Sequence, residues 1–213
     1  MIRNFCFASA PKGGGNKISR FENRSRRVSV SPGFFVLLAL LYYLDGGLGL
    51  LGWGLTACAL HELGHGAAIR LLGGGIERIS LTAVGAELAL DGGRPLSYGR
   101  ECAAALAGPG VSLLTALLAA RGKQFLLAGL SLGQGMFNLL PVLPLDGGRA
   151  LCLLLSGRLG ADRAEAALGA VSAVLSGLLL GGGLILMRVF GNPTLLVTAA
   201  WLTAGQIKKG GGR

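Results

Sequence analysis

Apolar residues dominate this chain in long blocks that are separated by short polar or glycine-rich segments. Several blocks are roughly 20 residues long, which is the length that an α-helix needs to cross a lipid bilayer. The blocks predict helices over residues 33–44, 48–72, 98–120, 124–140, 164–190 and 193–207, with a short helix over 150–155. We therefore expect an all-α polytopic membrane protein with about six transmembrane helices.

The segment from Ile76 to Leu90 has a different pattern. It alternates partly between apolar and polar positions, it is rich in β-branched residues, and the turn sequence Asp91-Gly92-Gly93 follows it. Such a run favours strands over a helix. We expect a small β-hairpin or ribbon between the second and third helices.

The two ends of the chain are polar and basic. Residues 1–32 carry many Lys and Arg residues against the single acid Glu22, and they lack the apolar core and small-residue cleavage site of a secretory signal peptide. We expect a flexible cytoplasmic tail over 1–32, a six-helix domain over 33–207 and a short basic cytoplasmic tail over 208–213.

Composition supports the membrane assignment. The chain is 52% hydrophobic and 14% charged, whereas about a quarter of the residues of a soluble domain are usually charged. The net charge of +10 could indicate nucleic-acid binding, but the distribution of charge gives a simpler reason. With the N-terminus inside, all of the 20 Lys and Arg residues except Arg121, Lys123 and Arg188 fall on the cytoplasmic side, as the positive-inside rule predicts. We expect a multi-pass protein of the cell membrane, with both termini cytoplasmic and with the lipid bilayer rather than nucleic acid as its partner.

The four cysteines give no sign of a metal or redox motif. Cys6, Cys58, Cys102 and Cys152 show no CxxC spacing, and three of them fall in predicted helices. Free cysteines in such surroundings behave as small apolar side chains. We expect free thiols.

The most informative local sequence is His61-Glu62-Leu63-Gly64-His65, which holds the only two histidines of the chain. Residues four apart project from the same face of a helix, one turn apart. HExxH on a helix is a zinc-site signature, in which two imidazoles hold the metal and the glutamate activates water. Ionisable groups inside a bilayer are costly and usually functional. We expect His61 and His65 as zinc ligands and Glu62 as the catalytic base.

A catalytic zinc ion usually has a third protein ligand, and the chain has no third histidine. Asp146 is the best candidate, because it follows the proline-broken segment 141–144. Irregular backbone at membrane depth is tolerated only where it is buried in protein or lines a cavity. Asp45 is a competing carboxylate, although it is expected at the opposite membrane face. Cys58, one helical turn before the motif, is a third alternative.

HELGH on a transmembrane helix, followed by Asn138-Leu-Leu-Pro-Val-Leu-Pro-Leu-Asp146-Gly-Gly, resembles the site-2 protease family of intramembrane zinc metalloproteases. The resemblance is nearest to the branch that contains stage IV sporulation protein FB. Gly108-Pro109 also resembles the third-helix motif of that family, although Ser112 stands where the family often has asparagine. Together these motifs extend over about half of the chain.

The resemblance implies a site and a substrate class. It implies that His61, His65 and Asp146 ligate zinc, that Glu62 is the catalytic base, and that Asn138 helps to position substrate or to stabilise the oxyanion. From the residues alone, Asn138 could equally be a hydrogen bonder in helix packing. The implied substrate is a membrane-anchored protein, such as a pro-sigma or anti-sigma factor, cleaved in regulated intramembrane proteolysis. Sporulation is one setting for such an activity, and a membrane regulatory partner is a further expectation.

Two classes of function stay open from the residues. The first is an intramembrane zinc metalloendopeptidase. The second is a non-proteolytic membrane protein, either a zinc-binding scaffold or a metal transporter. A transporter would favour ionisable groups along a path, whereas here they concentrate in one site with Glu101 as the main outlier. The glutamate of the motif favours the enzyme, because a purely structural zinc site needs no base.

Overall fold

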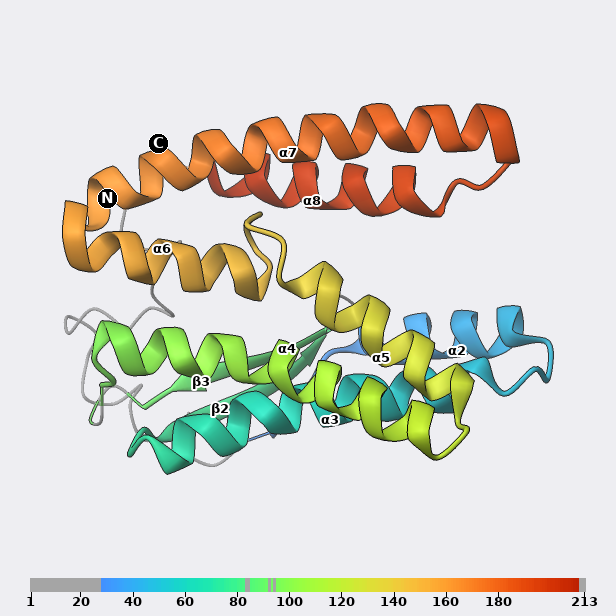
Figure 1. Cartoon of the computed structure of the whole chain (residues 1–213), viewed down its shortest axis with the longest axis horizontal. Helices are drawn as coiled ribbons and strands as arrows, with labels where there is room; N and C mark the ends of the chain where they lie inside the picture. The colour runs from blue at the N-terminus through green and yellow to red at the C-terminus, as the bar shows by residue number, and fades with distance from the viewer. Residues whose placement is uncertain (1–27, 83–84, 92, 94, 211–213) are drawn as a thin grey trace. The chain divides into compact units, whose positions relative to one another are not determined.

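The computed structural model describes residues 28–82, 85–91, 93 and 95–210, and Figure 1 shows its helices and strands. The chain divides into two compact units. Within the described residues, the N-terminal unit ends at Met136 and the C-terminal unit begins at Phe137. Most of the tail that we expect over 1–32 lies outside the described part of the chain.

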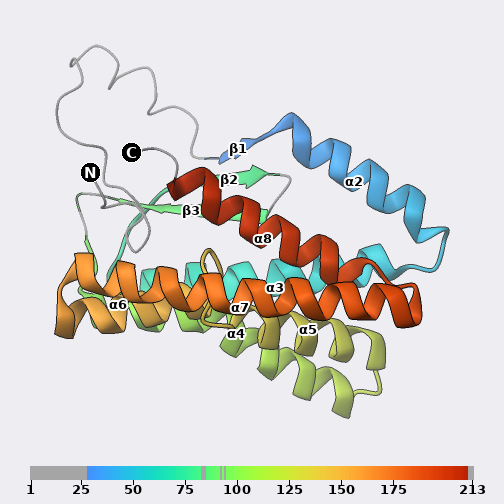
Figure 2. The same ribbon diagram turned by 90° about the horizontal axis from the view of Figure 1, so that it is seen from above.

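The helices of the N-terminal unit follow the apolar blocks closely. They are α2 (Pro32–Asp45), α3 (Leu50–Leu71), α4 (Tyr98–Arg121) and α5 (Phe125–Asn138), the last of which ends in the C-terminal unit. Asp45 makes the turn between α2 and α3, because its carboxylate accepts hydrogen bonds from the backbone N–H groups of Gly49 and Leu51, both at 2.9 Å. Helices α3 and α4 pack along each other (Figures 1 and 2).

The N-terminal unit also contains a small three-stranded sheet. It contains β1 (Val28–Val30), β2 (Ile76–Thr82) and β3 (Gly85–Leu90) in the order β1-β2-β3. The antiparallel β2–β3 pair confirms the expected hairpin. Strand β1 was not expected, and it pairs in parallel with β2.

The position of β1 corrects part of the expected tail. Residues 28–30 form a strand, and Ser31 donates a backbone hydrogen bond to the carbonyl of Leu81 at 2.8 Å. The Ser29 and Ser80 hydroxyl oxygens also lie 3.0 Å apart. A three-residue strand carries too little local pattern to be recognised in a sequence, and its stability comes from a partner that is some 50 residues away.

The C-terminal unit consists of segment 139–145 and three helices: α6 (Asp146–Leu159), α7 (Ala161–Phe190) and α8 (Thr194–Gly210). Helices α7 and α8 lie side by side after a reversal at Gly191, which has a φ of 66° (Figures 1 and 2). Val142 and Leu145 are buried and join Leu202 of α8 in a core cluster. Segment 139–145 is therefore a packed part of the core and not a surface loop.

Two expectations about this unit need correction. Helix α6 is longer than the predicted 150–155 and begins at Asp146, because glycines at its start do not prevent a helix whose first turn is held by packing. Cys58 and Cys102 carry thiols, as expected, but Cys152 is disulfide-bonded. Disulfide pairing depends on proximity in the fold, which sequence spacing does not reveal.

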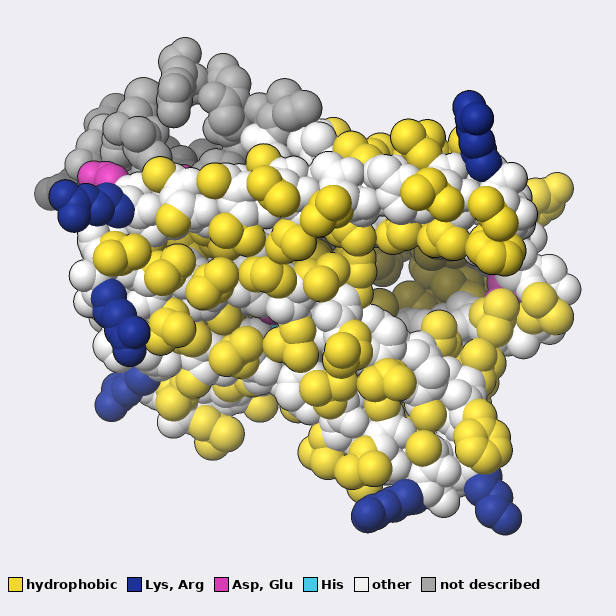
Figure 3. Space-filling model, turned by 45° about the horizontal axis from the view of Figure 1, so that its top comes forward, with side chains coloured by type: hydrophobic (Ala, Val, Ile, Leu, Met, Phe, Trp, Pro, Cys, Tyr) yellow, Lys and Arg dark blue, Asp and Glu magenta, His cyan; other side chains and the backbone are white. Residues whose placement is uncertain are grey.

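Apolar side chains cover much of the visible surface, with separate Lys and Arg side chains at its margins (Figure 3). Helices α4 and α7 are long and apolar enough to cross a membrane, and only 33% and 17% of their most apolar stretches are buried inside the protein. Soluble proteins rarely expose apolar patches of this extent. Two helices could therefore span a bilayer by length and composition, and the expected six spans are not confirmed. Helix α2 and residues Thr194–Ala204 of α8 are apolar but shorter.

Gly183 fixes how closely α7 and α8 approach, and it gives a test of this packing. A Cβ atom at Gly183 would lie 2.7 Å from the backbone of Leu196. We predict that Gly183→Ala lowers the free energy of unfolding by about 1–3 kcal/mol through overpacking, although alanine is the better helix former. Thermal unfolding in detergent measures the change.

Gly182→Ala is the matched control, because a Cβ at this neighbouring position would approach only the Leu195 side chain, at 3.9 Å. This variant should be neutral or slightly more stable than the wild type. Equal unfolding midpoints for the two variants would show that Gly183 does not set the approach of the helices.

Candidate metal centre

Helix α3 brings the two histidines together on its buried face. Its buried residues are Ala57, His61, Gly64, His65 and Ile69, which is the spacing of one helical stripe. The imidazole rings meet edge to face, with centroids 4.8 Å apart, and their Nε2 atoms are 3.2 Å apart. The sequence prediction that both rings share one face is therefore confirmed.

The second nitrogen of each ring is held by α4. His65 Nδ1 lies 2.8 Å from the carbonyl oxygen of Ala104, and His61 Nδ1 lies 2.9 Å from the hydroxyl of Ser112. A carbonyl can only accept a hydrogen bond, so His65 carries a proton on Nδ1, and in the neutral ring its Nε2 presents a lone pair. Metal-binding histidines characteristically use their second nitrogen in this way.

The Ser112 hydroxyl lets His61 accommodate either a proton or a cation at the centre. A hydroxyl both donates and accepts. It can donate to His61 Nδ1 while His61 Nε2–H donates to His65, or it can accept from Nδ1–H while both Nε2 lone pairs face a cation. The pair therefore fits a metal ion without any change of ring position.

Two glycines allow α3 and α4 to come close enough for these contacts. A Cβ atom on Gly108 of α4 would overlap the imidazole of His65, and a Cβ on Gly64 of α3 would lie 2.8 Å from Val111. Small residues at such crossings let helix backbones approach in apolar surroundings. Steric clash thus explains why Gly64 of the HELGH motif and Gly108 of the Gly108-Pro109 motif are glycines.

Glu62 is half-buried and follows His61 on α3. Cys58, one turn earlier, is exposed and lies near enough to interact with the Glu62 carboxylate. Glu62 and both histidines also take part in further interactions within the protein. The glutamate is therefore placed next to the imidazole pair, on an adjoining part of the helix surface.

Asp146 occupies the first turn of α6, where an acidic side chain is favoured by the helix dipole. The chain reaches it through a tightly packed turn. A Cβ on Gly147 would overlap the carbonyl of Leu139, and a Cβ on Gly148 would lie 2.6 Å from that of Val142. Both glycines are buried, so they are needed for segment 139–145 to fold against the start of α6.

The other candidate site residues differ in their surroundings. Asn138 is half-buried at the C-terminal end of α5 and takes part in interactions within the protein. Asp45 uses its carboxylate to bond the start of α3, and Cys58 is exposed. His61, His65 and Asp146 form a group that could hold a metal ion, and neither Asp45 nor Cys58 belongs to it in the part of the chain that the structure describes.

Sequence reasoning missed two partners of the histidines. Ser112 is 1% exposed, and it stands where the resembling family often has asparagine; that departure was a signal for its polar role on α4. The Ala104 carbonyl carries no side-chain signal at all. Glu101, which the sequence marked as an outlier, is buried near the start of α4 and takes part in interactions there.

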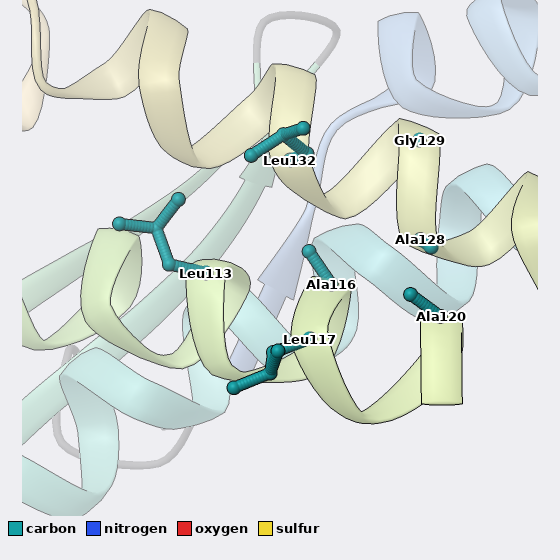
Figure 4. Close-up of a pocket in the computed structure, with 7 residues that line it drawn as sticks. All are labelled: Leu113, Ala116, Leu117, Ala120, Ala128, Gly129 and Leu132. Atoms are coloured by element: carbon teal, nitrogen blue, oxygen red, sulfur yellow. The ribbon is translucent and has the colours of Figure 1, made fainter. Parts of the chain in front are cut away.

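A cavity of about 320 Å³ lies between α4 and α5 (Figure 4). Its lining consists of Leu113, Ala116, Leu117, Ala120, Ala128, Gly129 and Leu132. An entirely apolar lining offers no group for acid–base or metal chemistry. This cavity therefore contributes no candidate catalytic or metal-binding side chain.

Comparison with known proteins points to one family. Residues 121–180 match peptidase family M50. This stretch includes Asn138 and Asp146 but not the HELGH motif. A zinc metalloprotease of Methanocaldococcus jannaschii is 30% identical over 146 residues, which is 63% of this chain and 42% of that protein.

A second relative is Rip3 of Mycobacterium tuberculosis, whose name describes it as a zinc metalloprotease. It is 34% identical to this chain over 152 residues, which is 63% of this chain and 37% of Rip3. The chain thus spans about two fifths of the length of these relatives. The site-2 protease from Methanocaldococcus jannaschii is a solved structure with a TM-score of 0.66 and 24% identity, covering 85% of this chain and 89% of the other. The chain therefore has the fold of a site-2 protease, and its residues 121–180, which carry Asp146, match peptidase family M50.

Proposed function

We propose that this chain is a zinc-dependent intramembrane endopeptidase that cleaves membrane-anchored proteins. The observation that carries the proposal is the imidazole pair of His61 and His65, whose Nε2 atoms converge while α4 holds both Nδ1 atoms. The site-2 protease fold, the match to peptidase family M50 and the zinc metalloprotease relatives support it.

His61, His65 and Asp146 would hold the zinc ion. Two imidazole nitrogens and a carboxylate oxygen are the donors of several catalytic zinc sites, which leave a further position open. When bound, zinc supplies a Lewis acid that polarises the scissile carbonyl and makes water a better nucleophile. Ser112 and the Ala104 carbonyl keep the two rings oriented for that role.

Glu62 would act as the general base. It would take a proton from the attacking water and deliver it to the nitrogen of the departing amine. Asn138 would donate an amide hydrogen bond to substrate or to the oxygen that gains negative charge, as oxyanion-stabilising groups do.

The proposed substrate is a membrane-anchored protein. A membrane-anchored substrate must unwind locally, because a helix keeps its peptide bonds in intrahelical hydrogen bonds. Strand β3 is an edge strand of the sheet, and an extended segment could add to it. We propose a multi-pass enzyme with both termini cytoplasmic that acts on a pro-sigma or anti-sigma factor together with a membrane regulatory partner. The stage IV sporulation protein FB branch, and with it a role in sporulation, stays a prediction.

Zinc content is the first test. We expect about one zinc ion per chain in the detergent-purified wild type, and loss of zinc in both His61→Ala and Asp146→Ala, because each removes one of three ligands. Elemental analysis of the purified proteins measures this. Asp45→Ala is the matched control and should keep its zinc, since Asp45 bonds only backbone groups in the contacts described above. Zinc retained in Asp146→Ala would place the third ligand elsewhere.

Glu62→Gln separates catalysis from metal binding. The amide keeps the size of the side chain but cannot accept a proton, so we expect zinc content to be unchanged and cleavage of a membrane-anchored test substrate to fall by about 10²–10⁴-fold. Cleavage assays in detergent or proteoliposomes give the rate. A variant that cleaves at the wild-type rate would rule out the base role, and a scaffold or transporter would show no cleavage even in the wild type.

Gly108→Ala tests whether the close approach of α4 holds the site. The added methyl group would overlap the His65 imidazole, so we expect zinc affinity to fall by about 10–100-fold, the effect of disturbing groups that orient metal ligands. Gly110→Ala is the matched control on the same helix, because a Cβ there meets no atom within 4 Å. Competition with a zinc chelator measures both affinities, and equal values would contradict the steric argument.

A further inference from the structure

Most backbone N–H groups of residues 140–145 find their partners close by in the sequence, within residues 137–145. Pro141 and Pro144 have none to satisfy. The N–H groups of Leu140, Val142 and Leu145 donate to carbonyls of residues 137, 140 and 142 at 2.8–3.1 Å. Among residues 140–145, Leu143 alone donates its backbone N–H to a residue outside 137–145.

A side chain of α7 receives that remaining N–H group. Leu143 N–H donates to the Ser172 hydroxyl at 3.0 Å. Ser172 is 1% exposed and Leu143 is 4% exposed, so water cannot substitute for this bond. A buried peptide N–H without a partner is costly, and more so in apolar surroundings.

The carbonyl of the same residue is held by α8. Gln206 donates through Nε2 to the Leu143 carbonyl at 3.1 Å and to the Ser176 hydroxyl at 2.9 Å. Ser176 lies one turn after Ser172 on the same face of α7 and is 2% exposed. The backbone N–H and the backbone C=O of Leu143 are thus each held by a side chain, from two different helices.

These contacts are not routine features of hydroxyl groups in apolar helices. Such side chains usually bond the carbonyl four residues earlier in their own helix, and Thr198 and Thr203 of α8 do so at 2.8 Å. Ser172 and Gln206 instead direct their polar groups at a residue three positions before Asp146. The intervening turn is close-packed, because Gly148 leaves no room between α6 and the Val142 carbonyl.

We propose that Ser172, Ser176 and Gln206 form a polar clamp that positions Asp146 by fixing the backbone N–H and C=O of Leu143. The clamp residues are positioning residues and touch neither substrate nor metal. The effect on metal binding rests on the proposed function, in which Asp146 is a zinc ligand. The clamp also connects α7 and α8 to the segment before Asp146, so a partner or substrate that displaces either helix would alter the position of the carboxylate.

The test combines three variants with two matched controls. Ser172→Ala removes the acceptor of Leu143 N–H, Gln206→Met removes both amide donors at nearly constant length, and Ser176→Ala removes only the outer acceptor. The controls are Ser156→Ala, a buried α6 serine whose hydroxyl has no hydrogen-bond partner among the described residues, and Thr203→Val, whose hydroxyl bonds only its own helix. Each protein is purified in detergent and studied by amide hydrogen exchange, zinc affinity and cleavage kinetics.

We expect exchange over residues 139–148 to quicken at least tenfold in Ser172→Ala and Gln206→Met, and less in Ser176→Ala. Zinc affinity should fall by about 10–100-fold in the first two, with a lower kcat and an unchanged KM. Ser172→Thr keeps the hydroxyl and should restore all three properties. Both controls should behave as the wild type.

Wild-type exchange in Ser172→Ala and Gln206→Met would overturn the clamp. Faster exchange with wild-type zinc affinity would also overturn it, because the contacts would then be merely structural. Should Ser172→Ala fail to fold, Ser176→Ala and Gln206→Met decide the question by the same criteria. Failure of the proposed function would look different: the wild type would bind no zinc, while the exchange comparison would still report whether the clamp holds the segment.

Discussion

Two imidazole nitrogens 3.2 Å apart repel each other unless a proton or a cation lies between them, and the His61–His65 pair imposes this condition on the N-terminal unit. The Ala104 carbonyl fixes the tautomer of one ring, and the Ser112 hydroxyl adapts to either state of the other. Both contacts require α4 to lie against α3. That approach depends in turn on Gly64 and Gly108, because a Cβ atom at either position would clash with the facing helix.

The same physical rule operates in the C-terminal unit, with a peptide group in place of an imidazole. In apolar surroundings every polar group needs a partner within the protein. The Ser112 hydroxyl is the hydrogen-bond partner of a His61 ring nitrogen, and the Ser172 hydroxyl is the partner of the Leu143 backbone N–H. In both units a small buried hydroxyl on a neighbouring helix fixes a group next to a candidate ligand. Serines of this kind are as much part of the candidate site as the ionisable residues.

The match to peptidase family M50 covers residues 121–180, which include segment 139–145, the glycines that pack against it, and Ser172 and Ser176 of α7. Many positions in this stretch are constrained at once by backbone geometry, close packing and buried hydrogen bonds. Shared fold with the Methanocaldococcus jannaschii site-2 protease extends well beyond it, over 85% of the chain.

The sequence by itself determined the helices, the β2–β3 hairpin and the pairing of His61 with His65, because apolar blocks and an i, i+4 spacing are local signals. It also singled out Asp146 through the prolines before it. Tertiary structure alone decided strand β1, the early start of α6, and the partners Ser112, Ala104, Ser172 and Gln206. Apart from the start of α6, those features are contacts between residues 29 to 63 positions apart. Such contacts depend on which faces of the helices meet, and no local pattern encodes that.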